Sequence, residues 1–194
     1  MVLELTEEQI IENSKIANYH CPRYEELPKM YVYMDQLLTI LDEYLSPFDI
    51  ESEDKNMTAT MINSYVKKGI IPSPTNKKYS TVHIVYLIVL GTLKNVLSLS
   101  TIEKLIKMQK EQYPLARAYN FFATEMENAL KATFHSRDFS ETNSERERTP
   151  LSMVVHSALL AFANNVYVRK NVCLVVNQNT YRFRALAPIF AIRA

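Results

Sequence analysis

The chain has 194 residues, of which 47% are hydrophobic and 22% are charged, and its formal net charge is +1. This is an ordinary globular composition with enough apolar residues for a sizeable core. Only 2 residues are glycine and no run of short alternating strands is present, which argues against a β-sandwich or β-barrel and for a mainly α fold.

The charge is distributed unevenly along the chain. Residues 1–57 carry 4 basic and 13 acidic side chains, a net charge of −9, whereas residues 58–80 carry 4 lysines and no acidic residue. Residues 81–194 carry 14 basic and 8 acidic side chains. One basic segment in a nearly neutral chain indicates a local anionic partner rather than a basic coat over the whole surface.

Cysteine usage and the N-terminus indicate a cytoplasmic protein. The two cysteines, Cys21 and Cys173, are expected to be reduced thiols. The first residues, MVLELTEEQIIENSK, lack the basic-then-apolar layout of a secretory signal. The longest apolar run, IVYLIVLGTL at 84–93, is too short to cross a bilayer, so we expect a core helix there and no membrane partner.

In chain order, a first helix is predicted at 6–20, where Thr6 is a suitable cap and two Glu follow in the first turn. A second helix is predicted at 30–45, because its apolar residues recur at helical spacing. Residues 48–57 follow as an acidic connection.

The basic segment divides into a helical and a non-helical part. Thr58 is a suitable N-cap for a short helix, and Gly69 stands where a left-handed C-cap would fall. The next stretch, IIPSPTNKKYS, contains two prolines and is predicted to be extended, with a turn near PTNK. Ser80 can then cap a long apolar helix over about 81–97.

Two more helices are predicted after that one. Ser98 or Ser100 starts a helix over about 100–111, and Pro114, at an N1-like position, starts another over about 115–135.

The remainder of the chain is predicted to contain a loop, a last helix and an end whose structure the sequence leaves open. Residues 136–149 are polar and charged and are expected to form a flexible loop. Pro150 is expected to open a last helix that runs to Lys170. Residues 171–194 are compatible with a short strand, a docked tail or a disordered end.

From residue 58 onwards the predicted order is a short helix, a glycine, a basic excursion and two further helices, which is the order of a winged helix-turn-helix. A short helix can lie in the major groove and present Asn, Ser or Thr to base edges. A basic excursion beside it can reach phosphates.

Three stretches carry a more specific likeness: MINSYVKKGIIPSP, then KKYS, then LSLSTIEKLI. They resemble the recognition helix, KKG-I/L-I-P turn, wing and later S-x-x-E/D-I helix of MerR-type DNA-binding domains. The combination T-x-x-MIN-Y-V-K followed by P-x-x-KKY is similar to the bacterial domain-of-unknown-function family 1836, for which a MerR-like DNA-binding role has been inferred. The resemblance covers most of residues 25–170.

This resemblance implies a MerR-like winged helix-turn-helix domain at 25–112. The layout of the chain adds a helical C-terminal region at 113–170 and a tail at 171–194, so the expected mainly α fold has three parts. The recognition helix would be 58–68 and the wing 70–79. The helix at 30–45 would have to serve as the scaffold helix, although an acidic connection separates it from residue 58.

The candidate DNA-binding residues are Thr58, Thr60, Asn63, Ser64, Tyr65, Lys67, Lys68, Lys77, Lys78 and Tyr79. The lysines suit phosphate contacts, with a solvated surface as the alternative. Asn63 stands where MerR proteins usually have Arg and could pair with adenine, with surface polarity as the alternative. Tyr65 is balanced between the core and a phosphate contact, and the core is favoured for Tyr79.

Other sites find less support in the sequence. His20 and Cys21 are adjacent but lack ligands at a second spacing, so we expect no metal. Ser152 and His156 share a helix face without an orienting carboxylate, which argues against a hydrolase. Two glycines cannot form a phosphate-binding loop, and no cofactor is expected. The lack of an activated nucleophile or an acid–base pair argues against an enzyme. The aromatic stripe around Phe121 is expected to be core, with a ligand pocket as the alternative.

The predicted function is therefore a transcriptional regulator that binds double-stranded DNA, as a homodimer. The helices after residue 113 would provide dimer contacts or bind an unknown effector. The alternative is a protein-interaction module that keeps the winged-helix shape but binds an acidic protein.

Overall fold

The structure is a computed structural model that describes residues 7–49, 57–136 and 149–190, with side chains described as far as Val172. Its elements are α1 (Glu7–Ala17), α2 (Met34–Leu45), a 3-10 turn (Ser46–Phe48), α3 (Ala59–Lys67), α4 (Thr81–Leu93), α5 (Leu99–Gln112), α6 (Leu115–Lys131), a π-helical turn (Ala132–Ser136) and α7 (Pro150–Phe190). The expected mainly α fold is confirmed. Extended structure in these ranges is limited to two isolated β-bridges.

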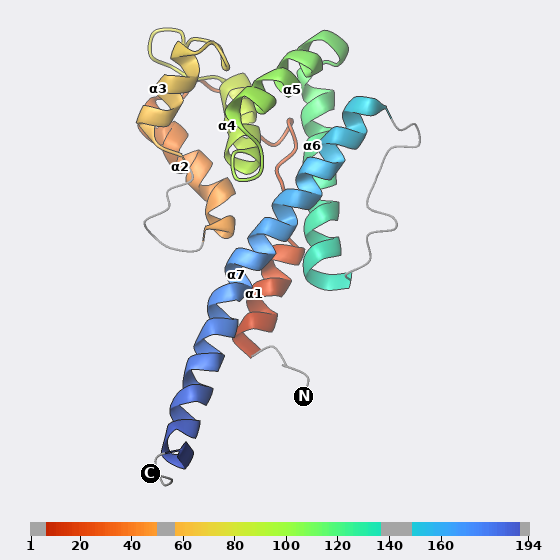
Figure 1. Ribbon diagram of the computed structural model, residues 1–194. Coiled ribbons are helices and arrows are strands. Elements are labelled where there is room, and N and C mark those ends of the chain that lie inside the picture. The colour runs from red at the N-terminus through yellow and green to blue at the C-terminus, as the bar shows by residue number, and fades with distance from the viewer. Residues whose placement is uncertain (1–6, 50–56, 137–148, 191–194) are drawn as a thin grey trace.

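Helix α4 lies in the middle of the molecule (Figure 1), as expected for the apolar run at 84–93. All of its residues except Val82 and Val89 are buried. On one side α4 approaches α2 closely at Gly91, where a Cβ atom would lie 2.5 Å from Leu45 Cδ1. Because this helix has no solvent-exposed face, neighbours on every side must cover it.

The helices after residue 113 belong to the same hydrophobic core as the preceding ones. Phe48 contacts Tyr19 and Phe162 edge-on, with ring centroids 4.8 and 5.3 Å apart. The carboxylate of Glu125 on α6 lies 2.6 Å from Nδ1 of His156 on α7. The proposed division between residues 112 and 113 remains a prediction.

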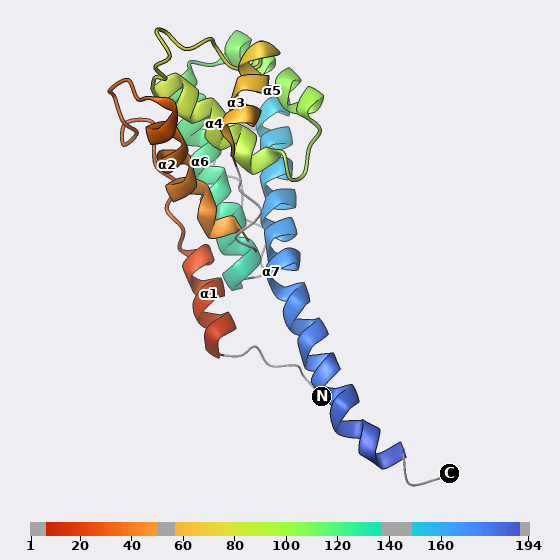
Figure 2. The same ribbon diagram turned by 90° about the vertical axis from the view of Figure 1, so that its left-hand side faces the viewer.

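Helix α7 is longer than expected. It continues without a break to Phe190, past the body of the molecule (Figures 1 and 2), whereas the sequence left residues 171–194 open between strand, tail and disorder. Its Pro150–Val172 part is long and apolar enough to cross a membrane by length and composition alone. In the structure this part packs against α6 and supplies core residues such as Leu159.

Several predicted boundaries differ from the structure. The second helix begins at Met34 rather than at residue 30, because Val32 pairs with Tyr79 through backbone hydrogen bonds of 2.9 and 2.8 Å. Pro114 is the N-cap rather than the first residue of α6. The helix predicted at 81–97 ends at Leu93.

Other boundaries agree, and some lie outside the description. Ser98 is the N-cap of α5, Ser80 precedes α4, and Pro150 opens α7, as predicted. The first helix ends at Ala17, before residue 20. The proposed cap Thr6 and most of the 48–57 and 136–149 connections are outside the described residues.

Candidate nucleic-acid interface

Helix α3 has the two ends that the sequence predicts. The hydroxyl oxygen of Thr58 accepts a hydrogen bond from the backbone N–H of Met61 at 3.3 Å, which satisfies one of the free donors of the first turn. Gly69 follows the helix with φ of +72°, a conformation that residues with a Cβ atom rarely adopt. Both predicted caps are confirmed, and they limit α3 to a short helix.

One face of α3 is buried and the opposite face is polar. Ile62 and Tyr65 are 0% and 7% exposed. Thr60, Asn63 and Lys67 are exposed, and their spacing of three and four residues places them on the same side of the helix. The helix therefore presents a row of hydrogen-bonding and basic side chains to solvent.

Residues 75–78 form a tight turn, which confirms the turn predicted near PTNK. Thr75 and Lys78 exchange two backbone hydrogen bonds of 3.1 and 2.9 Å. The two residues between them, Asn76 and Lys77, both have positive φ, 50° and 61°. This is the geometry of a two-residue hairpin turn in which both central residues are left-handed, here without a glycine.

The turn is anchored at its base in the core. Tyr79 is buried, and its ring meets that of His83 edge-on with centroids 5.3 Å apart. Nδ1 of His83 accepts a hydrogen bond from the backbone N–H of Ser80 at 2.9 Å. Burial lowers the pKa of His83, so the neutral ring that can accept this bond is favoured.

The four lysines of the basic segment carry unneutralised charge. Lys67, Lys68 and Lys77 are exposed, and the half-buried Lys78 places its ammonium 5.2 Å from the ring centroid of Tyr33. Among the residues that the structure describes, none of the four forms an ion pair. Figures 1 and 2 show α3 and the loop after it at the end of the molecule opposite the C-terminal tip of α7.

The structure removes three predicted residues from the exposed set. The rings of Tyr65 and Tyr79 are in the core, which agrees with the core alternative for both. The hydroxyl of Thr58 is engaged as a helix cap. What remains is the α3–turn surface: Thr60, Asn63, Ser64, Lys67, Lys68, Lys77 and Lys78.

Sequence reasoning missed an apolar patch beside this surface. Met30, Tyr31 and Tyr33 are 71%, 62% and 55% exposed, on the segment that pairs with Tyr79. The exposure of these side chains was not foreseen, because the sequence analysis assigned them to a helix. The alternation of Tyr31 and Tyr33 around the buried Val32 is the pattern of an extended segment and could have revealed the patch.

The remaining candidates do not converge into a site. His20 lies 2.9 Å from the carboxylate of Glu26 and 3.1 Å from that of Glu127, while burial raises the pKa of the neighbouring Cys21 thiol to about 12. The carboxylate that the sequence did not place beside His156 is present, since Oε2 of Glu125 lies 2.6 Å from the imidazole Nδ1. The hydroxyl of Ser152, however, donates to the backbone oxygen of Thr149 at 2.9 Å, as part of a helix cap.

Comparison with known proteins identifies a family for this region. A family model described as domain of unknown function (DUF1836) matches residues 22–122, which is just over half of the chain. Comparisons with curated proteins and with solved structures find no match. The matched region contains α2 to α5, and therefore the whole α3–turn surface.

Proposed function

Since the chain belongs to the DUF1836 family and its α3–turn surface lies inside the residues that the family model matches, we propose that the protein is a MerR-like transcriptional regulator that binds double-stranded DNA. Residues 58–68 would enter the major groove as the recognition helix. Residues 70–79 would act as a short wing on the sugar–phosphate backbone. Such a regulator would act in the cytoplasm of a bacterial cell.

The observation that carries this proposal is the set of four lysines at the end of α3 and in the turn after it, none of which forms an ion pair with a described residue. Lysines that contact phosphates release counterions from DNA, so unneutralised ammonium groups favour binding to a polyanion. Asn63 lies in the polar row between Thr60 and Lys67, and its amide can form two hydrogen bonds with adenine. The connection from α2 to α3, residues 46–58, is longer than the three or four residues usual in a helix-turn-helix.

A homodimer is part of the proposal. Twelve of the twenty residues 171–190 are apolar, in a stretch where α7 extends past the body of the molecule (Figure 2). A second copy of α7 could cover this apolar length. Dimeric regulators place two recognition helices on half-sites related by two-fold symmetry, so a palindromic site is expected.

The test begins with duplexes selected from random DNA by the full chain, whose affinity is then measured by fluorescence anisotropy over a range of salt. We expect Lys77→Glu/Lys78→Glu to lower the affinity at least 10-fold, because two attractive phosphate contacts become repulsive. The control Lys15→Glu/Lys131→Glu changes the net charge equally on α1 and at the end of α6, and should retain most of the affinity. Equal affinities for the two double variants would contradict the wing assignment.

A second variant separates charge from folding. Lys77→Gly removes the ammonium group while glycine accepts the positive φ of this position without strain. We expect a weaker affinity with no loss of thermal stability. A weaker affinity that follows a lower melting temperature would indicate that the turn acts only through the fold.

The exposed Met30, Tyr31 and Tyr33 favour a second candidate, a module that binds an acidic protein. Methionine and tyrosine are enriched in protein interfaces, and here they adjoin basic residues. In that case the selection from random DNA would enrich no sequence, and Tyr31→Ser/Tyr33→Ser would abolish capture of a protein from the native lysate. DNA binding that survives this variant supports the first candidate.

A further inference from the structure

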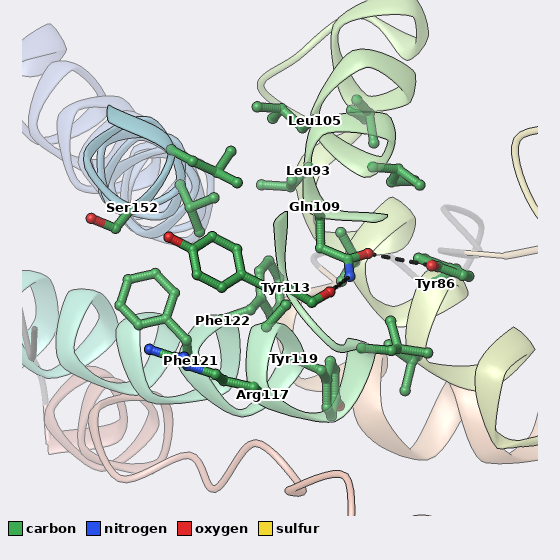
Figure 3. A pocket seen from close by; sticks show the side chains of 18 of the residues that line it. Tyr86, Leu93, Leu105, Gln109, Tyr113, Arg117, Tyr119, Phe121, Phe122 and Ser152 are labelled. Atoms are coloured by element: carbon green, nitrogen blue, oxygen red, sulfur yellow. Dashed lines mark hydrogen bonds between the residues drawn. The ribbon is translucent and has the colours of Figure 1, made fainter. Parts of the chain in front are cut away.

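An apolar cavity lies on the side of α4 that faces α5, α6 and the first turns of α7 (Figure 3). Its volume is about 100 Å³, and it opens to solvent. The lining is mostly hydrophobic and includes Val85, Val89, Leu105, Phe121, Phe122 and Leu151. The cavity is separate from the α3–turn surface, because none of that surface's residues lines it.

Two polar side chains that line the cavity, Tyr86 and Gln109, are already hydrogen-bonded. Gln109 Oε1 accepts a hydrogen bond from the hydroxyl of Tyr86 at 3.3 Å, and its Nε2 donates to the backbone oxygen of Tyr113 at 2.8 Å (Figure 3). A polar ligand would have to break these bonds to gain its own. The body of a ligand that fits here is therefore apolar.

Two cations lie against aromatic rings that line the cavity. The guanidinium of Arg117 is 5.4 Å from the ring centroid of Tyr113, and the ammonium of Lys110 is 5.1 Å from that of Tyr86. Both side chains are exposed, and within the described part of the chain neither forms an ion pair. Figure 3 shows Arg117 beside Phe121 at one side of the cavity, with Tyr86 and Gln109 at the other.

We propose that this cavity binds a small amphipathic carboxylate, with its apolar part inside and its carboxylate on Arg117. The planar guanidinium can donate two parallel hydrogen bonds to a carboxylate. The cavity of about 100 Å³ is smaller than the closed cavity of about 150 Å³ that holds benzene in a protein core, but it opens to solvent. Its size therefore limits the apolar part to a short alkyl chain or to one ring that extends into the opening. The ligand class is thus an acid with a single aromatic ring or a short alkyl chain.

This proposal does not depend on DNA binding, and its test uses the full chain alone. Phenylacetate and hexanoate serve as probes, and their neutral amides, phenylacetamide and hexanamide, as matched controls. Binding is measured by titration calorimetry and by chemical-shift changes in NMR spectra. We expect at least one acid to bind with one molecule per chain, at least 10-fold more tightly than its amide.

Two variants locate the site. Arg117→Gln should remove the preference for the acid over its neutral amide, because the glutamine side chain lacks the positive charge of arginine. Ala118→Leu, which adds bulk to a residue that lines the cavity, should weaken both ligands at least 10-fold. Ala116→Leu adds the same bulk to a neighbour outside the lining and should leave both affinities unchanged.

Three results would overturn the proposal: no binding of either acid at millimolar concentration, equal affinity of acid and amide, or an acid preference that persists in Arg117→Gln. If Ala118→Leu does not fold, the comparison of acid and amide binding in Arg117→Gln still tests the proposal. Arg117 is an exposed side chain, so its replacement leaves the core intact.

Discussion

At the scale of single residues, His83 links the stability of the turn to pH. Burial lowers the pKa of this imidazole from its ordinary value of 6.5, so the unfolded chain binds a proton more readily than the folded one. The contribution of neutral His83 is complete above pH 6.5 and is lost as the pH falls through the folded-state pKa. We expect the free energy of unfolding, measured with urea, to decrease between pH 7.5 and pH 5.

His83→Gln is the matched variant for this measurement. A glutamine oxygen can still accept the hydrogen bond from the Ser80 N–H, as in a capping box, but it does not titrate in this range. The variant should therefore lose less stability on acidification than the natural chain does. Parallel stability curves would show that His83 does not cause the acid sensitivity.

The sequence predicts residues well where the cause is local. Thr58, Gly69 and Ser80 were assignable because helix caps and left-handed turns depend on the side chain at one position. The sequence could not decide whether Tyr65 is a core residue or a phosphate contact, because the two alternatives differ only in which face of α3 meets the core. That choice depends on the packing of distant segments.

At the scale of elements, the pair of Glu125 and His156 joins α6 to α7. Glu125 is fully buried and His156 is 16% exposed, so removing the carboxylate deletes a hydrogen bond between the two helices inside the core. We expect Glu125→Ala to lower the free energy of unfolding by about 1–3 kcal/mol. In a double-mutant cycle with His156→Ala, the two effects should sum to more than the effect of the double variant.

The surface pair of Glu12 and Lys15 is the internal comparison. Its atoms are 3.9 Å apart and the Lys15 side chain is largely solvated. Because Glu12 also contacts Lys170 of α7 at 3.1 Å, only Lys15 is replaced, and Lys15→Ala should cost less than about 1 kcal/mol. An additive Glu125 and His156 cycle would mean that the buried pair contributes nothing beyond its separate partners.

Most helices were predictable from the sequence, but several of their ends were not, among them the start of α2 and the end of α7. Hydrophobic spacing extended the second helix back to residue 30, whereas pairing of Val32 with Tyr79 holds that segment extended. This pairing joins residues 47 positions apart, which no local pattern encodes. The sequence beyond Lys170 lacks a clear helical period, and its helix is a continuation of one that begins in the core.

At the scale of the whole molecule, the proposed dimer depends on the part of α7 beyond the body. We expect light scattering on a sizing column to give twice the mass of one chain for the full protein. A chain ending at Val172 should elute as a monomer, since it lacks the apolar length of 171–190. It should still fold, because core residues of α7 such as Phe162 and Val166 remain.

The full-length Lys15→Ala variant, whose changed side chain is exposed on α1, serves as the control and should remain a dimer. A full chain that is monomeric at micromolar concentration, or a truncated chain that remains dimeric, would contradict this role of α7. The cavity corresponds to the alternative that the sequence offered for the aromatic stripe around Phe121, which lines it. The sequence could not decide between core and pocket, because only the packing of four helices leaves the space open.

Because α4 has no exposed face, the order in which the ribosome makes the chain matters for its folding. Phe162 of α7, which packs on Phe48, emerges about 70 residues after α4 ends. At about 5–20 residues per second, this interval lasts roughly 3–14 s. For that time the hydrophobic side of α4 that α7 later covers is exposed on the nascent chain, where chaperones can bind it. A prematurely terminated product would keep this side exposed until proteases removed it.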